Sequence, residues 1–247
     1  MRNALQAGTV TITGAGGDEI EAYTAQPLDA PAKGGVVVIH HMPGYDEWSR
    51  DVVRRFAVLG FAAVCPNLYW REAPGADPDD AAAAARARGG VPDDRLVGDV
   101  AGAAEYLRAL PGANGKVATI GFCSGGRQSV LAGCALPLDA VIDCYGAFVV
   151  GVPPEGFPLA VTALYDQLPR LHAPVLGLFG NDDQYPTPAH VDELDRILTD
   201  QGTPHEFHRY DGAGHAFFAV DRPSYRPAAA VDGWTRIRTF LDRHLAA

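Results

Sequence analysis

Short apolar segments alternate with amphipathic segments along most of the chain. Segments with a strand pattern are found at residues 10–13, 20–25, 36–39, 61–65, 117–120, 140–144, 174–179 and 205–210. Segments with a helical pattern are found at residues 46–59, 94–110, 127–135, 188–201 and 228–245. This alternation predicts an α/β fold, in which a mostly parallel central sheet carries helices on both faces. Because no repeat or linker divides the chain, we expect a single domain over residues 1–247.

Residues 72–92 interrupt this regular alternation. They combine proline, glycine and aspartate with an alanine-rich run at residues 81–85, which predicts a short helix. Such an excursion is either a lid over a ligand site or a solvated loop, and the sequence leaves both interpretations open.

The charge and cysteine content narrow the classes of function. The 247 residues include 20 basic and 30 acidic ones, giving a formal charge of −10. We expect no binding to nucleic acid or to an anionic membrane, because no basic stripe is present to neutralise phosphates. No apolar run reaches the roughly 18 residues of a membrane span, and the first residues lack the apolar core of a signal peptide. The four cysteines form no C-x-x-C pair, so a cytoplasmic protein with free thiols is the simplest prediction.

One glycine-rich turn carries the strongest chemical signal. The sequence Gly121-Phe122-Cys123-Ser124-Gly125 lies between a predicted buried strand and a helix. It fits the pattern G-x-nucleophile-x-G of a nucleophile elbow, with cysteine as the nucleophile. The N-terminus of the following helix lowers the pKa of such a cysteine and favours the thiolate. Ser124 lacks a glycine two positions before it, so its backbone N–H is assigned instead as an oxyanion donor. The alternative interpretation is an ordinary turn with a buried thiol.

Two downstream loops supply a base and an acid in the chain order expected for this elbow. Asp182 and Asp183 come after the strand predicted at residues 174–179, and His215 lies in a glycine-rich loop after the next strand. A nucleophile needs a base, and the base needs a group that orients it. We therefore predict a triad of Cys123, Asp183 and His215. Asp182 is the alternative acid.

These motifs resemble the dienelactone hydrolase (carboxymethylenebutenolidase) family of the α/β-hydrolase superfamily. The resemblance covers nearly the whole chain and includes residues 36–44, 65–71, 121–126, 145–146, 180–188 and 214–217. It implies an α/β-hydrolase fold and the hydrolysis of a small ester or lactone without metal or organic cofactor. It implies Cys123 as nucleophile, Asp183 as orienter and His215 as base. It also implies that the Met42 N–H is the second oxyanion donor.

The chain departs from this family at two positions that concern the substrate. His41 falls where characterised dienelactone hydrolases carry a glutamate that interacts with the resting thiol, so His41 is a candidate pocket residue. Arg71 matches, by its Leu-Tyr-x-Arg setting, the first of two arginines that hold the substrate carboxylate in the family. The second arginine position falls near Ala219. Tyr45 and Trp70 are further candidate pocket residues, with core packing as the alternative for each.

The remaining predictions concern metals, partners and competing functions. No metal site is expected, because His40 and His41 are neighbours on a strand and point to opposite faces. The expected partner is a small ester or lactone, and the expected state is a monomer or a homodimer. Two other functions stay open: a thioesterase or other acyl hydrolase with the same triad, and a non-catalytic binding protein on the same fold.

Overall fold

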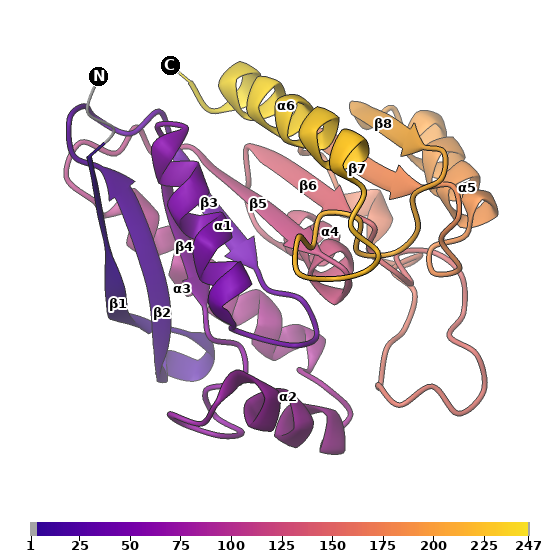
Figure 1. Cartoon of the computed structure of the whole chain (residues 1–247), viewed down its shortest axis with the longest axis horizontal. Coiled ribbons are helices and arrows are strands. Elements are labelled where there is room, and N and C mark those ends of the chain that lie inside the picture. The colour runs from indigo at the N-terminus through magenta and orange to yellow at the C-terminus, as the bar shows by residue number, and fades with distance from the viewer. Residues whose placement is uncertain (1–3, 247) are drawn as a thin grey trace.

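The computed structural model describes residues 4–246, in which helices and strands follow the predicted order (Figure 1). The strands are β1 (Leu5–Thr13), β2 (Glu19–Pro27), β3 (Gly35–Ile39), β4 (Ala62–Pro66), β5 (Val117–Phe122), β6 (Ala140–Cys144), β7 (Val175–Gly180) and β8 (His205–Tyr210). The helices are α1 (Glu47–Val58), α2 (Pro78–Ala87), α3 (Asp93–Arg108), α4 (Ser124–Ala135), α5 (Pro188–Gln201) and α6 (Pro227–His244). Two short 3-10 helices are Ala15–Gly17 and Leu168–Arg170.

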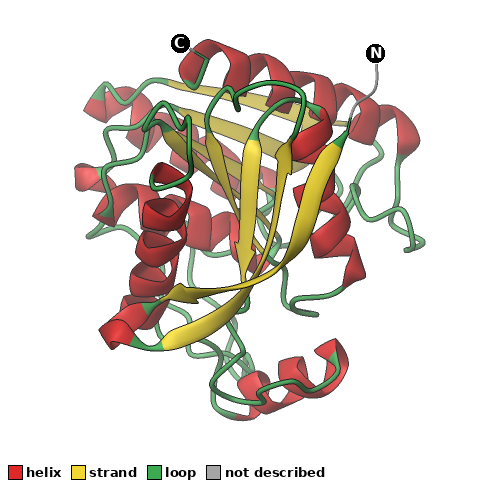
Figure 2. Ribbon diagram, turned by 90° about the vertical axis from the view of Figure 1, so that its left-hand side faces the viewer, coloured by secondary structure: helices red, strands yellow, loops and turns green. Residues whose placement is uncertain are grey.

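All eight of these strands join one twisted sheet (Figure 2). Their spatial order is β1-β2-β4-β3-β5-β6-β7-β8. The pairs β1–β2 and β2–β4 are antiparallel, and every other neighbouring pair is parallel. Strands β3 to β7 are buried along their whole length, as expected for parallel strands that helices cover on both sides.

Helices cover both faces of the sheet. Helices α1 and α6 lie on the face toward the viewer in Figure 1, where Phe56 of α1 and Phe240 of α6 belong to one buried apolar cluster. The opposite face is covered by α3, α4 and α5, which contribute Val100, Leu131 and Leu198 to a second cluster. The expected α/β architecture, with a mostly parallel sheet between helices, is confirmed.

The parallel register brings the carboxyl ends of the central strands to one edge of the sheet. Gly121 at the end of β5 pairs with Asp143 of β6, and Gly180 at the end of β7 pairs with Tyr210 of β8. The residues that follow β5, β7 and β8 therefore start at the same edge, which is where ligands bind in sheets of this kind.

One strand boundary differs from the prediction, and the short helix predicted within residues 72–92 forms. The first strand starts at Leu5, earlier than predicted, because the antiparallel ladder pairs Leu5 with Pro27 although one side of β1 is exposed. The excursion at residues 72–92 contains α2, which lies beyond the strand ends and below the sheet in Figure 1. Within residues 4–246, no helix combines the length and the apolar character that crossing a membrane requires.

Candidate active site

Cys123 lies in a strained turn between β5 and α4. Its backbone has φ 58° and ψ −123°, a conformation that residues other than glycine rarely adopt. The turn is tight enough that a Cβ atom on Gly121 would collide with the carbonyl of Gly125, and one on Gly125 would collide with the carbonyl of Ile39. The two glycines of the motif thus allow the close backbone approach that lifts Cys123 above the end of the sheet.

His215 contacts one of the two candidate acids. Its Nδ1 atom lies 2.8 Å from Oδ2 of Asp183, whose side chain is only 3% exposed. The other carboxylate oxygen of Asp183 accepts a hydrogen bond of 2.9 Å from the N–H of Tyr185, which fixes the orientation of the carboxylate. Asp182 is exposed, so of the two neighbours it is Asp183 that holds the imidazole.

The thiol and the imidazole form a polarised pair. Burial alone raises the pKa of Cys123, but the hydrogen bond and charge of His215, with the N–H groups of Ser124 and Met42, outweigh it and lower this pKa. Burial alone lowers the pKa of His215, but hydrogen bonds with Asp183 and Cys123 outweigh it and raise this pKa to about 10. Both shifts favour a thiolate beside an imidazolium at neutral pH.

The same two N–H groups both act on the sulfur of Cys123. Hydrogen bonds from the backbone N–H groups of Ser124 and Met42 each lower the pKa of Cys123, so each donor stabilises the charge on the sulfur. The carbonyl of Met42 accepts a hydrogen bond of 3.0 Å from the Tyr69 hydroxyl, which ties the Met42 loop to the chain after β4. Two converging backbone donors beside a nucleophile are the arrangement of an oxyanion hole.

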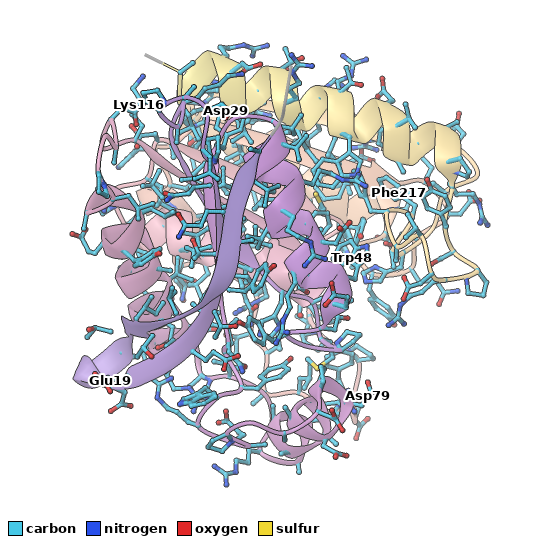
Figure 3. All side chains as sticks on the ribbon, turned by 60° about the vertical axis from the view of Figure 1, so that its left-hand side comes forward. Glu19, Asp29, Trp48, Asp79, Lys116 and Phe217 are labelled. Atoms are coloured by element: carbon cyan, nitrogen blue, oxygen red, sulfur yellow. The ribbon has the colours of Figure 1, made fainter. Side chains whose placement is uncertain are left out.

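His40 and His41 have partners other than the thiol. The Nε2 atom of His41 lies 2.6 Å from Asp46, and its ring packs against Trp48, which projects from α1 in Figure 3. His40 has Nδ1 2.9 Å from the carbonyl of His41 and accepts a hydrogen bond of 3.3 Å from the N–H of Leu68. Burial lowers the pKa of His40 to about 4, so its ring is neutral at pH 7. Neither ring lines the cavity at Cys123, and in the described part of the chain no three His, Cys, Asp or Glu side chains converge to hold a metal ion.

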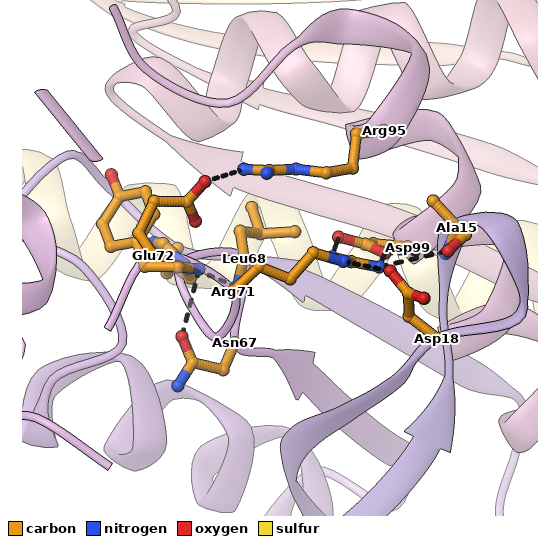
Figure 4. A network of polar contacts seen from close by, with 10 residues as sticks. Ala15, Asp18, Asn67, Leu68, Arg71, Glu72, Arg95 and Asp99 are labelled. Carbon is orange, nitrogen blue, oxygen red and sulfur yellow. Dashed lines mark hydrogen bonds and ion pairs between the residues drawn. The ribbon is translucent and has the colours of Figure 1, made fainter. Parts of the chain in front are cut away.

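Arg71 lies in a structural ion-pair network instead of the cavity (Figure 4). Its guanidinium makes two bonds of 2.9 Å to the carboxylate of Asp99, which is fully buried, and one of 2.7 Å to Asp18. A further bond of 3.2 Å goes to the carbonyl of Ala15. The expectation that Arg71 clamps a substrate carboxylate is therefore corrected: the side chain is already neutralised and faces the 3-10 turn after β1.

Tyr45 and Trp70 also lie away from the cavity at Cys123. Tyr45 is buried in the core, and the guanidinium of Arg50 stacks on its ring at 4.7 Å. Trp70 is half-buried and borders a depression beside β1 and β2. Of the aromatic residues around this part of the chain, Tyr69 is the one that reaches the cavity wall.

A cavity of about 190 Å³ opens beside the thiol. Its lining residues come from the turn at Cys123 and the start of α4, from the chain after β3, β4 and β6, and from two loops at residues 89–93 and 157–161. They are Met42, Tyr69, Gly89, Gly90, Val91, Asp93, Cys123, Ser124, Arg127, Gln128, Ala147, Phe148, Phe157, Leu159, Ala160 and Val161. The end of the excursion at residues 72–92 thus walls the cavity. It is tied to the second loop by a hydrogen bond of 2.8 Å from the N–H of Ala160 to the carbonyl of Gly89.

Sequence reasoning missed most of this wall. Arg127, Asp93, Phe148 and Phe157 were not singled out, since no motif marks them and their meeting depends on how α3, α4 and the chain after β6 pack together. The one available signal was position, because the loop that carries Phe148 follows β6 and so starts at the same sheet edge as Cys123.

The chain is similar to known proteins over almost its whole length. The model of the dienelactone hydrolase family matches residues 20–245. A Salmonella typhimurium protein named "Putative carboxymethylenebutenolidase" is 34% identical over 240 residues, which are 95% of this chain and 86% of that protein. The carboxymethylenebutenolidase of Pseudomonas putida is 28% identical over 241 residues, 94% of each chain.

A solved structure shows the same fold. The crystal structure titled as a "Putative Dienelactone Hydrolase" from Klebsiella pneumoniae superimposes with a TM-score of 0.85 and is 30% identical, covering 98% of this chain and 100% of that one. The family match and these relatives confirm the expected α/β-hydrolase fold and the expected enzyme class, a hydrolase of esters or lactones. The chain belongs to the dienelactone hydrolase family.

Proposed function

We propose that this protein hydrolyses small carboxylic esters or lactones by covalent catalysis through Cys123, His215 and Asp183. The observation that carries the proposal is the position of His215, which contacts Asp183 through Nδ1 and polarises the thiol of Cys123 at a cavity. Nucleophile, base and orienting acid are thus connected in series, as covalent hydrolysis requires.

The first half of the cycle transfers the acyl group to sulfur. The Cys123 thiolate attacks the carbonyl carbon, and the oxyanion that forms accepts hydrogen bonds from the N–H groups of Ser124 and Met42. A donor of this kind contributes about 3–4 kcal/mol of transition-state stabilisation in related sites. When the tetrahedral intermediate collapses, the C–O bond breaks and the His215 imidazolium gives its proton to the leaving alkoxide. In a lactone this alcohol stays attached to the acyl group.

The second half returns the thiolate. Neutral His215 takes a proton from water, and the resulting hydroxide attacks the thioester carbonyl. Collapse of the second tetrahedral intermediate releases the carboxylic acid and leaves the thiolate–imidazolium pair as it began. Asp183 holds the imidazole in one orientation and stabilises its charged form throughout. The cycle consumes only the ester or lactone and one water molecule, so the proposal includes no metal or organic cofactor.

The test is hydrolysis of 4-nitrophenyl butyrate by the purified protein, with Cys123→Ala as the blank and rapid-quench mass spectrometry of the intact chain. We expect Cys123-dependent turnover and a mass increase of one butyryl group on the wild type. Incubation with a chelator should leave the rate unchanged. Turnover that persists in Cys123→Ala would exclude the mechanism. A folded protein with neither turnover nor acylation would exclude it too and would favour the non-catalytic alternative.

A further inference from the structure

The cavity beside Cys123 has an apolar wall. Phe148 and Phe157 meet edge to face with ring centroids 4.9 Å apart, and Leu159, Val161 and Val91 extend the same surface. Cys123 lines the same cavity, so an acyl group attached to its sulfur would lie beside this wall. Apolar side chains of this kind favour an apolar group by removing its surface from water.

The one cation among the described residues that line the cavity is Arg127, and it is fully engaged within the protein. Its Nη1 and Nη2 atoms each donate a hydrogen bond of 2.8 Å to a carboxylate oxygen of Asp93. Its Nε and Nη2 atoms donate to the carbonyl of Thr162 at 3.2 and 2.7 Å. The residue is only 4% exposed. Because Asp93 also lines the cavity, the two charges cancel at the wall.

No other arginine or lysine among the described residues lines the cavity to replace it. Arg71 is bound by Asp18 and Asp99 away from the cavity. Arg86 and Arg88, at the end of α2, are exposed to solvent and are not among the cavity-lining residues. A carboxylate on the acyl group would lose its water here without gaining a charged partner, which is costly.

We infer that this site selects small acyl groups that are uncharged and apolar and excludes those that carry a carboxylate, and that the Arg127–Asp93 pair sets this preference. The inference rests on the proposed function and specifies its substrate class. The volume of about 190 Å³ is below the roughly 300 Å³ at which drug-sized sites begin, so the group is a short or branched chain or a single ring. Asp93 is a specificity-determining residue, since its charge cancels that of Arg127.

Two matched esters test this preference. The 4-nitrophenyl monoester of glutaric acid carries a carboxylate where 4-nitrophenyl 5-methylhexanoate carries an isopropyl group of the same shape. After subtraction of each uncatalysed rate, we expect kcat/KM for the 5-methylhexanoate to be greater by about tenfold to a hundredfold, the penalty for an unpaired charge in a desolvated site. A wild-type enzyme that prefers the glutarate ester would overturn the inference. If Arg86→Ala then lost that preference, the anion site would lie at Arg86, at the end of α2.

The role of Asp93 in this preference is tested by comparing Asp93→Asn with Asp94→Asn. Both remove one negative charge from the start of α3, but Asp94 is exposed and lies outside the cavity. Asp93→Asn leaves the charge of Arg127 uncancelled, so we expect the ratio of the two kcat/KM values to move at least about tenfold toward the glutarate ester. In Asp94→Asn the ratio should move less than about twofold. Equal shifts in the two variants would refute the role of Asp93.

A binding measurement separates failure of this inference from failure of the proposed function. Cys123→Ala cannot form the thioester, so calorimetric titration with the two intact esters reports the preference of the cavity without turnover. Tighter binding of the 5-methylhexanoate supports the inference even if the wild type hydrolyses neither ester, which would count against the catalytic proposal alone. Equal or tighter binding of the glutarate ester refutes the inference even if both esters are hydrolysed.

Discussion

His215 and Asp183 are 32 positions apart in the chain, yet the imidazole Nδ1 lies 2.8 Å from the carboxylate. Asp183→Asn keeps the shape of this side chain but removes the charge that holds and stabilises the imidazolium. We expect kcat to fall by a factor on the order of 10⁴, as when a triad aspartate is replaced elsewhere. The matched control is Asp182→Asn, which removes the same charge one residue away at an exposed position and should keep activity within about twofold. Steady-state kinetics on 4-nitrophenyl butyrate check both, and a larger loss in Asp182→Asn would reverse the assignment.

The reactivity of Cys123 should persist in mild acid. The lowered pKa of Cys123 and the raised pKa of His215 keep the thiolate populated at acidic pH values at which an ordinary thiol is already neutral. At pH 6 an unperturbed cysteine is ionised to only about 0.3%. We therefore expect the alkylation rate of Cys123 by iodoacetamide at pH 6 to fall by about a hundredfold in His215→Ala. The other three cysteines are buried, so mass spectrometry can follow the single reacting site. A rate that does not change in the variant would mean that no ion pair is present.

His40 should make the protein less stable in acid. Its pKa of about 4 in the folded protein is below the 6.5 of an unfolded histidine, because burial disfavours the charged ring. The unfolded chain thus binds the extra proton between pH 6.5 and 4, so His40 lowers the free energy of unfolding by about 3 kcal/mol across this window as the pH falls.

The effect of His40 is measured as a difference between two proteins. Burial raises the pKa of Asp143 to about 7, which acts in the opposite direction over the same pH range. We therefore compare the free energy of unfolding in urea of the wild type and of His40→Gln at pH 7 and pH 4. Contributions that both proteins share, such as that of Asp143, cancel in the difference. We expect the wild type to lose about 3 kcal/mol more than the variant between these two conditions. Parallel pH profiles would show that His40 is not neutral in the folded state.

Arg71 should matter for stability and not for the substrate. Arg71→Met removes the partner of the fully buried Asp99 carboxylate, so we expect a loss of about 3–5 kcal/mol in the free energy of unfolding. Asp18→Asn removes a partner that is 60% exposed and should cost less than about 1 kcal/mol. At a temperature where both variants are folded, the kcat/KM ratio of the glutarate ester to the 5-methylhexanoate should equal that of the wild type. A fall in this ratio specific to Arg71→Met would restore its role as an anion clamp.

Much of the fold was predictable because its elements are regular. Continuous apolar runs such as residues 36–39 and 140–144 are typical of strands covered on both faces, and those strands form where expected. The candidate triad was predictable for a related reason. Cys123, Asp183 and His215 each follow a strand, and parallel strands bring their carboxyl ends to one edge whatever the loops between them do.

The substrate-facing residues were not predictable in this way. The local setting of Arg71 fixes its backbone position, but its side chain is directed by Asp18 and Asp99, which are 53 and 28 positions away. Likewise Asp93 and Arg127 are 34 positions apart and meet because the first turns of α3 and α4 pack against each other. Such contacts depend on side-chain charges that no periodic pattern records.

The origin of the cavity walls has an evolutionary consequence. The candidate triad residues follow β5, β7 and β8, whereas much of the apolar surface beside Cys123 is supplied by residues 89–93 and 157–161, outside the sheet. Mutations in these two loops can therefore change which acyl group is accepted while the reacting atoms keep their positions. A protein built in this way can acquire new substrates by small steps, since each step leaves the costly strained turn at Cys123 untouched.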